Sequence, residues 1–374
     1  MKKQNIANIV LLVCLASVMA FFSLSYIFSS ENSFSEDENR ALQTFPRFSV
    51  EKLLNGTYTH QLHNYFSDQI ALRKEMIQIK ATTELLMGKN ENNGILLGKD
   101  NYLIETYQYN DENYEFLRKN FYKIEKLMHN LEENNIQVNS ILIPRKVDIL
   151  EEYFSPYYSN EQNQIVWKQV NNKHISLKDS LSLRVDGGAN VFYKTDHHWN
   201  AEGAYYAYCE IANVLDFVPH SLEYFNLQTL SSDFYGTTYS KSGFFFVDAE
   251  EIKAPTIENG RYRVTIVDTE TEIDSLYDLS YLDKKDKYSL FLSGNNAHVK
   301  IYDAQDDTKE TLLIIKDSFS HSLAPYLCEH YNIELIDPRY YSGSIEEYIS
   351  ENNIENVLFL FGLDTLASAN IVIR

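Results

Sequence analysis

The 374-residue chain is predicted to be an α/β protein with a doubly wound, mostly parallel sheet that follows an N-terminal transmembrane helix. Three features lead to this prediction. Residues 6–28 form an uncharged apolar run, and from about residue 106 segments with helical periodicity alternate with strand-like segments. Residues 311–315 (Thr-Leu-Leu-Ile-Ile) read as a continuous apolar strand, of the kind buried on both faces of a parallel sheet. In such folds the ligand site lies at the carboxyl ends of the strands.

Composition excludes several classes of protein. The chain has 53 acidic and 33 basic side chains and a formal net charge of -20, so binding to nucleic acid through its phosphates is not expected. Hydrophobic residues make up 44% of the chain and aromatic residues 14%, which is enough for a sizeable core and excludes a disordered protein. Outside the apolar run only Cys209 and Cys328 occur, too few for a disulfide framework or a repeated zinc motif.

Residues 1–30 are predicted to be a membrane anchor or signal segment. Lys2 and Lys3 precede the apolar run, which is about long enough to cross a bilayer as a helix. The acidic residues from Glu31 to Glu38 follow the run, which places the amino end in the cytoplasm and the rest of the chain outside. A cleaved signal peptide is the alternative, but the run is longer than a usual signal segment, so we expect an uncleaved anchor.

Residues 31–105 are predicted to form a connector and the entrance to the main domain. Residues 31–50 are polar, and a helical segment with apolar positions between residues 70 and 86 ends at Gly88. Residues 94–103 then read as two short strands around a Gly-Lys-Asp-Asn turn.

Residues 106–374 are predicted to form the α/β domain. Apolar residues between 111 and 135 recur at steps of three and four, which indicates an amphipathic helix. The other elements expected here are strands at 138–144, 190–193, 311–315, 333–336 and 357–361, and helices at 161–181, from 201 to about 215, through 323–327 and at 344–350.

Residues 220–305 interrupt this alternation. Strand-like segments and turn residues predominate there, and we interpret the stretch as an inserted, mostly β segment. It is predicted to be a lid, a second lobe of the substrate cleft, or an extension of the main sheet.

Polar side chains follow each predicted strand of the α/β domain. Because the carboxyl ends of parallel strands share one edge of a sheet, these side chains are expected to converge there. In chain order they are Arg145 and Lys146, Asp196 to Trp199, Asp317 and Ser318, Asp337 and Arg339, and Asp364.

Residues 194–200 (Lys-Thr-Asp-His-His-Trp-Asn) hold the densest group of side chains suited to catalysis. Asp196 and His198 are two positions apart, so on an extended loop they point to the same side. Ser318 lies in a strand-to-helix turn, where a serine hydroxyl is exposed beside backbone N–H groups. An imidazole can take the serine proton and a carboxylate can orient the imidazole. We therefore hypothesise that Ser318, His198 and Asp196 form a catalytic triad.

Two alternatives stay open for these residues. Ser318 can instead be the N-cap of the following helix, a common place for serine. His197 and His198 can belong to a metal site, but no His-x-Glu pair and no cysteine ligands accompany them. We therefore expect neither a metal nor another cofactor.

The stretch 195–200 resembles the signature of the DHHW family, whose members are similar to the alginate O-acetylation proteins of the AlgJ and AlgX type. That resemblance implies an SGNH-hydrolase-like fold with permuted motifs, in which the Asp-x-His pair precedes the serine. The likeness also covers residues 35–40, 94–103, 234–237, 242–243, 316–319 and 336–341.

The resemblance implies a role for each matching residue: Ser318 is the nucleophile, His198 the general base and Asp196 its orienting carboxylate. His197 occupies a position that is threonine in the alginate proteins, and it is expected to touch substrate or to pack.

The sequence departs from the SGNH pattern at two places. Lys316 stands where glycine precedes Asp-Ser, and residues 361–364 (Phe-Gly-Leu-Asp) lack the asparagine of the Gly-x-Asn-Asp block. The oxyanion donor is therefore expected to be Arg339 or a backbone N–H. The remaining candidates for substrate or oxyanion contacts are His197, Lys146, Trp199 and Tyr340.

These observations predict an extracytoplasmic, membrane-anchored O-acyltransferase, in particular for acetyl groups, or an esterase. Its substrate would be an exported polysaccharide or a cell-wall glycan. The family resemblance further implies a membrane-bound O-acyltransferase partner that hands acetyl groups across the bilayer. A non-catalytic glycan-binding or scaffolding component of an export complex is the alternative.

Overall fold

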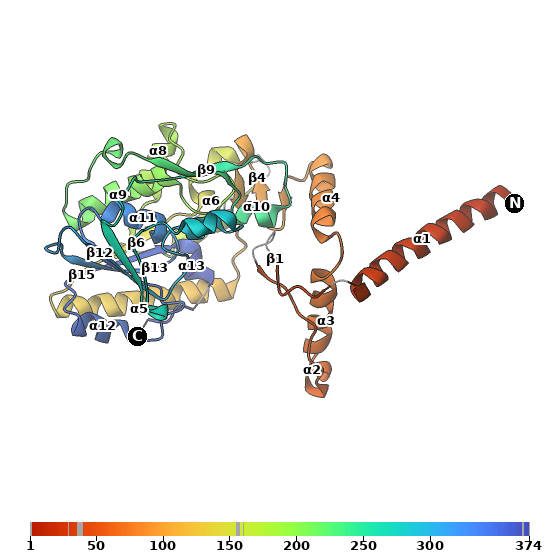
Figure 1. The fold of residues 1–374 in the computed structure, drawn as a ribbon, viewed down its shortest axis with the longest axis horizontal. Helices are drawn as coiled ribbons and strands as arrows, with labels where there is room; N and C mark the ends of the chain where they lie inside the picture. Colours follow the sequence, from red (N-terminus) through yellow and green to blue (C-terminus); the bar gives the residue numbers. More distant parts are fainter. Residues whose placement is uncertain are drawn as a thin grey trace. The chain divides into compact units, whose positions relative to one another are not determined.

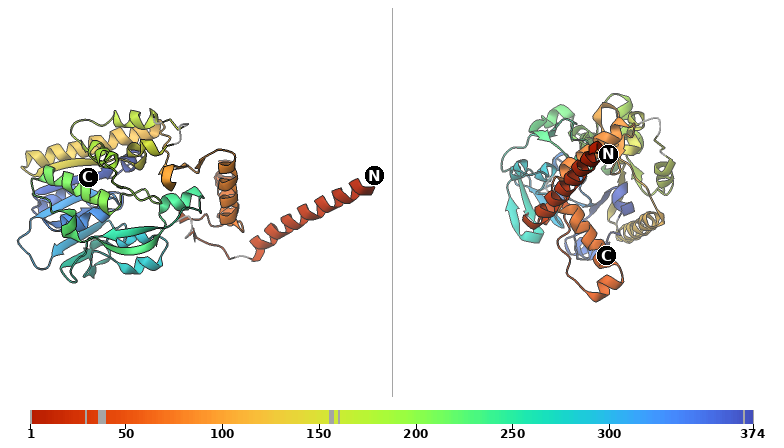
Figure 2. Two further views of the ribbon diagram at one scale, coloured as in Figure 1. Left: turned by 90° about the horizontal axis from the view of Figure 1, so that it is seen from above. Right: turned by 90° about the vertical axis from the view of Figure 1, so that its right-hand side faces the viewer.

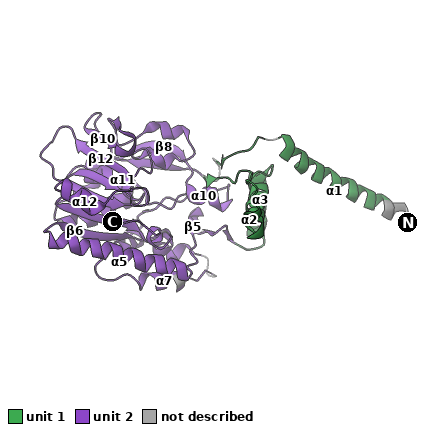
Figure 3. Cartoon of the chain, turned by 90° about the horizontal axis from the view of Figure 1, so that it is seen from below, with its two compact units in different colours: residues 1–89 green, residues 90–374 purple. Residues whose placement is uncertain are grey.

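The structure, a computed structural model, describes residues 2–28, 30–35, 40–154, 158–159, 161–368 and 370–373. Contacts divide the chain into two compact units, residues 1–89 and residues 90–374 (Figure 3). The strands predicted within 94–103 belong to the second unit, so the boundary between the units precedes them. Of the predicted acidic connector, Glu36, Asp37 and Glu38 lie outside the described residues.

The first unit is mostly helical. Its apolar helix is long and apolar enough to cross a membrane between Ile6 and Phe28, with a mean hydropathy of 2.4, although a signal sequence has the same properties. The helical segment predicted before Gly88 is α4, whereas α2 and α3 are further helices in the stretch before it. The elements are α1 (Lys2–Phe28), β1 (Phe34–Ser35), β2 (Arg40–Ala41), α2 (Val50–Leu54), α3 (Thr57–Asp68) and α4 (Arg73–Leu86).

The second unit is built on an eight-stranded sheet, which confirms the prediction of a mixed α/β fold with a mostly parallel sheet (Figure 1). Neighbours from β14 to β7 pair in parallel, and β11, β10 and β12 extend the sheet as antiparallel strands. Across the sheet the strands are β11 (Thr271–Ile273), β10 (Tyr262–Ile266), β12 (His298–Asp303), β14 (Asn332–Ile336), β13 (Thr311–Lys316), β15 (Asn356–Gly362), β6 (Gln137–Ile143) and β7 (Ile175–Ser176).

Helices cover both faces of this sheet, as Figures 1 and 2 show. Alternate residues of β13 point to opposite faces: Leu313 and Ile315 pack with α5, α12 and α13, while Leu312 and Ile314 pack with α8, α9 and α11. Burial on both faces explains the continuous apolar run of β13. The helices are α5 (Asp111–Glu133), α12 (Ile345–Glu351), α13 (Leu363–Ser368), α8 (Lys178–Asp186), α9 (Ala201–Leu215) and α11 (Ser320–Leu327).

Two smaller sheets complete the second unit. One is antiparallel with the order β3 (Glu91–Asn92), β4 (Ile95–Leu97) and β5 (Leu103–Glu105), which contains the predicted strand pair. The other pairs β8 (Gln228–Phe234) with β9 (Glu250–Ala254). Within residues 220–305 this pair is separate from the main sheet, whereas β10, β11 and β12 are part of it.

Two predicted elements are wrong. Residues 161–181 are not one helix but α7 (Glu161–Trp167), a turn, β7 and the start of α8, because residues 175–176 pair with β6 instead. Residues 190–193 are not a strand of the main sheet. Their backbone bonds run to their own loop, through the isolated bridge between Phe192 and Trp199, so the Asp196 loop does not follow a sheet strand.

The strand order creates a switch point in the main sheet. From β6 the chain moves outward to β7 on one side, and from β13 it moves to β14 on the other, with β15 between β13 and β6. Crevices at such reversals, outside the carboxyl ends of the strands, are where α/β folds bind ligands.

Candidate active site

Ser318 lies in the turn between β13 and α11, at the carboxyl edge of the sheet. The Asp317 carboxylate holds this turn, because it accepts hydrogen bonds from the backbone N–H groups of Phe319 (3.1 Å) and Gly362 (2.7 Å) and from the Thr365 hydroxyl (2.7 Å). The ends of β13 and β15 are thereby joined. Ser318 itself is partly exposed, whereas Asp317 and Phe319 on either side of it are buried.

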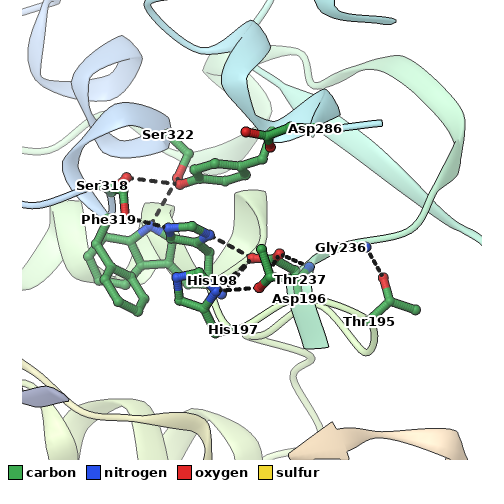
Figure 4. Close-up of polar contacts among 12 residues, drawn as sticks. Thr195, Asp196, His197, His198, Gly236, Thr237, Asp286, Ser318, Phe319 and Ser322 are labelled. Carbon is green, nitrogen blue, oxygen red and sulfur yellow. Dashed lines mark hydrogen bonds and ion pairs between the residues drawn. The ribbon is translucent and has the colours of Figure 1, made fainter. Parts of the chain in front are cut away.

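His198 and Asp196 approach Ser318 from the loop before α9 (Figure 4). His198 Nε2 lies 2.7 Å from Ser318 Oγ, and His198 Nδ1 lies 2.6 Å from Asp196 Oδ1. The same Asp196 oxygen accepts the backbone N–H of His198 at 3.0 Å. The carboxylate therefore favours the tautomer with the proton on Nδ1, which leaves Nε2 free to accept the serine proton.

Asp196 is held by groups from the β-rich segment. Its Oδ2 accepts the backbone N–H of Thr237 at 2.7 Å and the Thr237 hydroxyl at 3.1 Å, at the start of α10 (Thr237–Ser242). The preceding residue, Thr195, donates its backbone N–H (2.7 Å) and its hydroxyl to the Glu250 carboxylate. Its hydroxyl also accepts the Gly236 N–H at 3.1 Å. These contacts fix the carboxylate from two sides.

Burial and charge set the ionisation of the pair. Burial by itself raises the pKa of Asp196, but the imidazoles of His197 and His198 and the Thr237 N–H together hold that pKa well below its usual value. Burial, reinforced by the nearby His197, lowers the pKa of His198 despite the opposing Asp196 charge. The resting pair is thus a carboxylate and a neutral imidazole, which is the state a general base requires.

Aromatic rings enclose the His198 imidazole. The Tyr288 ring stacks on it with 3.8 Å between ring centroids and an angle of 7° between planes, and Phe319 meets it edge-on at 5.0 Å. The Tyr288 hydroxyl donates to the Ser318 carbonyl oxygen at 3.2 Å. Tyr288 thus contacts both His198 and the serine turn.

The family model for DHHW proteins matches residues 96–336, more than half of the chain. The chain belongs to the DHHW family. It is also 23% identical over 190 residues to the probable alginate O-acetylase AlgJ of Pseudomonas fluorescens, across 47% of this chain and 48% of that protein. The match thus spans about half the length of this relative, and the resemblance predicted from the sequence is confirmed.

Solved structures share the fold of this DHHW-family chain. A DHHW family protein from Eubacterium siraeum is 21% identical, with a TM-score of 0.57 over 75% of this chain and 94% of that one. PatB1 of Bacillus cereus, solved with a sulfonyl adduct, is 19% identical, with a TM-score of 0.59 over 74% of this chain and 98% of that one. At these identities the likeness concerns the fold.

Three residues around the chain of hydrogen bonds were not singled out from the sequence of this DHHW protein. Thr237 lies in a stretch on which the resemblance rests, so the family pattern could have indicated it. Tyr288 and Glu250 come from the β-rich segment, and nothing local distinguishes Tyr288 among 28 tyrosines. Only the fold brings them to the Asp196 loop.

Lys146 and Arg339 follow the sheet strands as predicted, but both are committed to other partners. The buried Lys146 ammonium donates to the carbonyl oxygens of Leu103 (2.8 Å) and Lys194 (3.3 Å), and burial lowers its pKa to about 8. Arg339 binds Asp337 through two hydrogen bonds of 2.9 and 2.6 Å. No described contact joins either residue to Ser318.

The other predicted contact residues have different surroundings. Trp199 is fully buried and donates its Nε1–H to Ser322 at 3.0 Å, so it presents no face for a sugar. Tyr340 is 54% exposed, and the Arg339 guanidinium lies 5.5 Å from its ring centre. His197 is partly exposed, and its Nδ1 lies 2.8 Å from the Thr237 hydroxyl.

Asp196, His197 and His198 also place ligand-type atoms within 4.8 Å of one another, as a metal site would. In the structure these side chains are engaged with each other, with Thr237 and with Ser318. A metal on His198 Nδ1 would displace the Asp196 carboxylate that orients the imidazole.

Proposed function

We propose that this protein is a membrane-anchored, extracytoplasmic O-acetyltransferase that acts on hydroxyl groups of a glycan. The observation that carries the proposal is the continuous hydrogen-bonded chain from Ser318 through His198 to Asp196, with 2.7 and 2.6 Å at its two links. A serine, a neutral imidazole and a carboxylate in that order are the parts of nucleophilic acyl transfer.

In the first step His198 Nε2 takes the proton as Ser318 Oγ attacks the carbonyl carbon of the acyl donor. The tetrahedral intermediate collapses when the donor oxygen leaves with the proton from His198, and the acyl group stays on Ser318 as an ester. Asp196 stabilises the imidazolium that exists between these two proton transfers.

In the second step a glycan hydroxyl attacks the Ser318 ester while His198 takes its proton, and Ser318 Oγ recovers that proton as it leaves. Water in place of the glycan gives an esterase. For the oxyanion, the backbone N–H of Ser318 has no acceptor within the part of the chain that the structure describes, so it can donate to the developing charge. Arg339 is less suited because Asp337 already holds it.

Relatives support the class of reaction and of acceptor. About half of the probable alginate O-acetylase AlgJ aligns with this chain. We therefore propose that the acceptor is an exported polysaccharide or a cell-wall glycan. Because acetyl-coenzyme A is not expected outside the cell, we propose a membrane-bound O-acyltransferase as the partner that supplies the acyl group.

The location of the reaction follows from the proposed topology. The apolar part of α1, Ile6 to Phe28, would be an uncleaved anchor, since Lys2 and Lys3 precede it and acidic residues follow it. Residues after the anchor, with the whole hydrogen-bonded chain, would then lie outside the cytoplasm.

Replacing Ser318 by Ala tests the proposal. Hydrolysis of p-nitrophenyl acetate and covalent labelling by a sulfonyl fluoride, read by intact mass, should both be lost, with a rate decrease of about 1,000-fold or more. Ser289→Ala is the matched control, because that hydroxyl bonds Asp286 and lies outside the chain of hydrogen bonds.

Two results would reject the catalytic role. Unchanged ester hydrolysis in Ser318→Ala, together with unchanged acetylation of the surface glycan of producing cells, would exclude Ser318 as the nucleophile. Absence of labelling in the unsubstituted protein, combined with retained oligosaccharide binding, would favour the non-catalytic scaffold.

A further inference from the structure

A cavity of about 320 Å³ lies beside the Asp196 loop, apart from the serine turn. Its volume is at the lower end of the range of ~300–1,000 Å³ that is typical of ligand pockets, so it suits one or two sugar rings rather than a long chain. It is lined by Asn101, residues 190–194, residues 200–202, Leu227 and residues 247–253. Residues 190–194 directly precede the Asp196 loop, and residues 200–202 directly follow it.

The charge of the lining favours a cation. Of its two lysines, Lys253 is paired with Glu251 at 2.9 Å, and the Lys194 ammonium lies 5.6 Å from the centre of the Tyr102 ring. The exposed carboxylates of Glu202 and Asp248 have no ion-pair partner in the described part of the chain. Since the whole chain also carries a net charge of -20, the cavity attracts ammonium groups and repels anionic sugars.

The uncharged part of the lining suits a sugar ring. The Asn101 carboxamide has no described partner, and the Asn190 carboxamide has one, the Tyr102 hydroxyl, which donates to its side-chain oxygen. A carboxamide both donates and accepts hydrogen bonds, as sugar hydroxyls do. Leu227 and Val247 add apolar surface for the C–H face of a ring. A small hydroxylated amine fits this combination.

The cavity wall is continuous with the support of Asp196. Glu250 lines the cavity and also accepts the backbone N–H groups of Lys194 (2.8 Å) and Thr195 (2.7 Å). Thr195 in turn accepts the Gly236 N–H, next to the residue that holds the Asp196 carboxylate. A ligand in the cavity therefore rests against the element that positions the base.

We propose that this cavity is a subsite for an amino-sugar unit of the acceptor glycan, one whose amine is free and protonated. The inference rests on the proposed function and deepens it, because it names the class of acceptor. Alginate is a polymer of uronic acids, so the proposal assigns this protein an acceptor of opposite charge to that in the name of its Pseudomonas relative.

Isothermal titration of the full-length protein with sugar tetramers tests the subsite. We expect the glucosamine tetramer, at mildly acidic pH, to bind about ten times more tightly than the N-acetylglucosamine tetramer, which lacks the charge. The uronic-acid tetramer should not bind. Affinity for the glucosamine tetramer should fall with added salt, since the attraction is electrostatic.

A charge reversal in the cavity and a matched one outside it test whether the glucosamine tetramer binds in the cavity. Asp248→Lys should weaken binding of the glucosamine tetramer by about tenfold or more. Asp307→Lys makes the same change of charge in the exposed loop before β13, at the opposite end of that strand from Ser318, and should leave binding unchanged. Both variants should hydrolyse p-nitrophenyl acetate normally, because neither contacts the hydrogen-bonded chain.

The outcomes separate the subsite from the proposed reaction. Equal binding of the uronic-acid or the N-acetylated tetramer, no binding of the glucosamine tetramer, or an equal effect of the two charge reversals would overturn the subsite. The proposed reaction, by contrast, would be rejected if Ser318→Ala still hydrolysed the ester, whatever the titrations show.

Discussion

His197 and His198 are adjacent in the chain, yet their side chains have different partners. His198 bonds Asp196 and Ser318, whereas His197 bonds the Thr237 hydroxyl and lies with its ring centre 3.8 Å from that of His198. The proximity of a second imidazole contributes to the lowered pKa of His198, after burial. His197 thus contributes to the lowered pKa that keeps the proposed base neutral.

Replacing His197 by Gln should shift the pH dependence of the reaction. Without its neighbour, the pKa of His198 rises toward the ordinary value of about 6.5, so a larger fraction of the base is protonated at mildly acidic pH. The acid limb of kcat/KM for p-nitrophenyl acetate should therefore move to higher pH. The exposed His129→Gln variant is the control, and an acid limb that stays or moves to lower pH would contradict the interpretation.

At the scale of elements, the start of α10 positions the carboxylate. Gly236 lies against Asp196: a Cβ built on Gly236 would fall 2.3 Å from the Asp196 Cβ and 2.7 Å from its Cα, far inside normal contact distance. Thr237, the next residue, donates to Asp196 Oδ2. The close approach that this hydrogen bond requires leaves no room for a side chain at position 236.

Gly236→Ala should therefore impair the reaction more than the fold. Displacing Asp196 misplaces His198, and a misplacement of about 1 Å can cost about 100-fold in rate. Gly260→Ala is an informative contrast, because its φ of +74° strains any side chain while nothing lies within 4 Å. It should lower stability by about 1–2 kcal/mol without loss of activity. Ester hydrolysis and thermal unfolding of both variants check the pair; full activity in Gly236→Ala would be inconsistent with this role.

At the scale of the whole molecule, the second unit keeps several histidines neutral. Burial lowers the pKa of His174, His198 and His321, and it lowers that of His330 to about 4, with the neighbouring His220 contributing. In the unfolded chain each would titrate near its ordinary value of about 6.5. Between the folded and unfolded pKa values, the unfolded chain therefore binds more protons than the folded protein.

Stability should accordingly fall as the pH drops below about 6.5, by up to about 1.4 kcal/mol per pH unit for each such histidine. Urea unfolding between about pH 7.5 and pH 5.5 measures the slope. His330→Gln removes one of these four groups and should reduce the slope, even though it also loses the 2.7 Å contact with the Tyr208 hydroxyl. An unfolding free energy that is constant or rises toward low pH would contradict this account.

The local elements followed from the sequence because their signals are local. The helix expected over residues 111–135 is α5, Asp111–Glu133, and its apolar positions are buried as the periodicity predicts. The strand at 311–315 is β13, because a continuous apolar run satisfies both faces of a covered sheet. The prediction of a single helix over residues 161–181 is wrong, because the pairing of residues 175–176 with β6 outweighs the helical pattern.

For the candidate site, the sequence by itself determined which side chains are chemically suited: Asp196, His198 and Ser318 have the required types and lie in turns. It did not determine their meeting, since 120 positions separate His198 from Ser318. Tertiary structure decided that contact, and it decided that Tyr288 stacks on His198 and that Glu250 holds the loop. Such contacts depend on long-range packing between segments, which leaves no periodic or composition signal in the segments themselves.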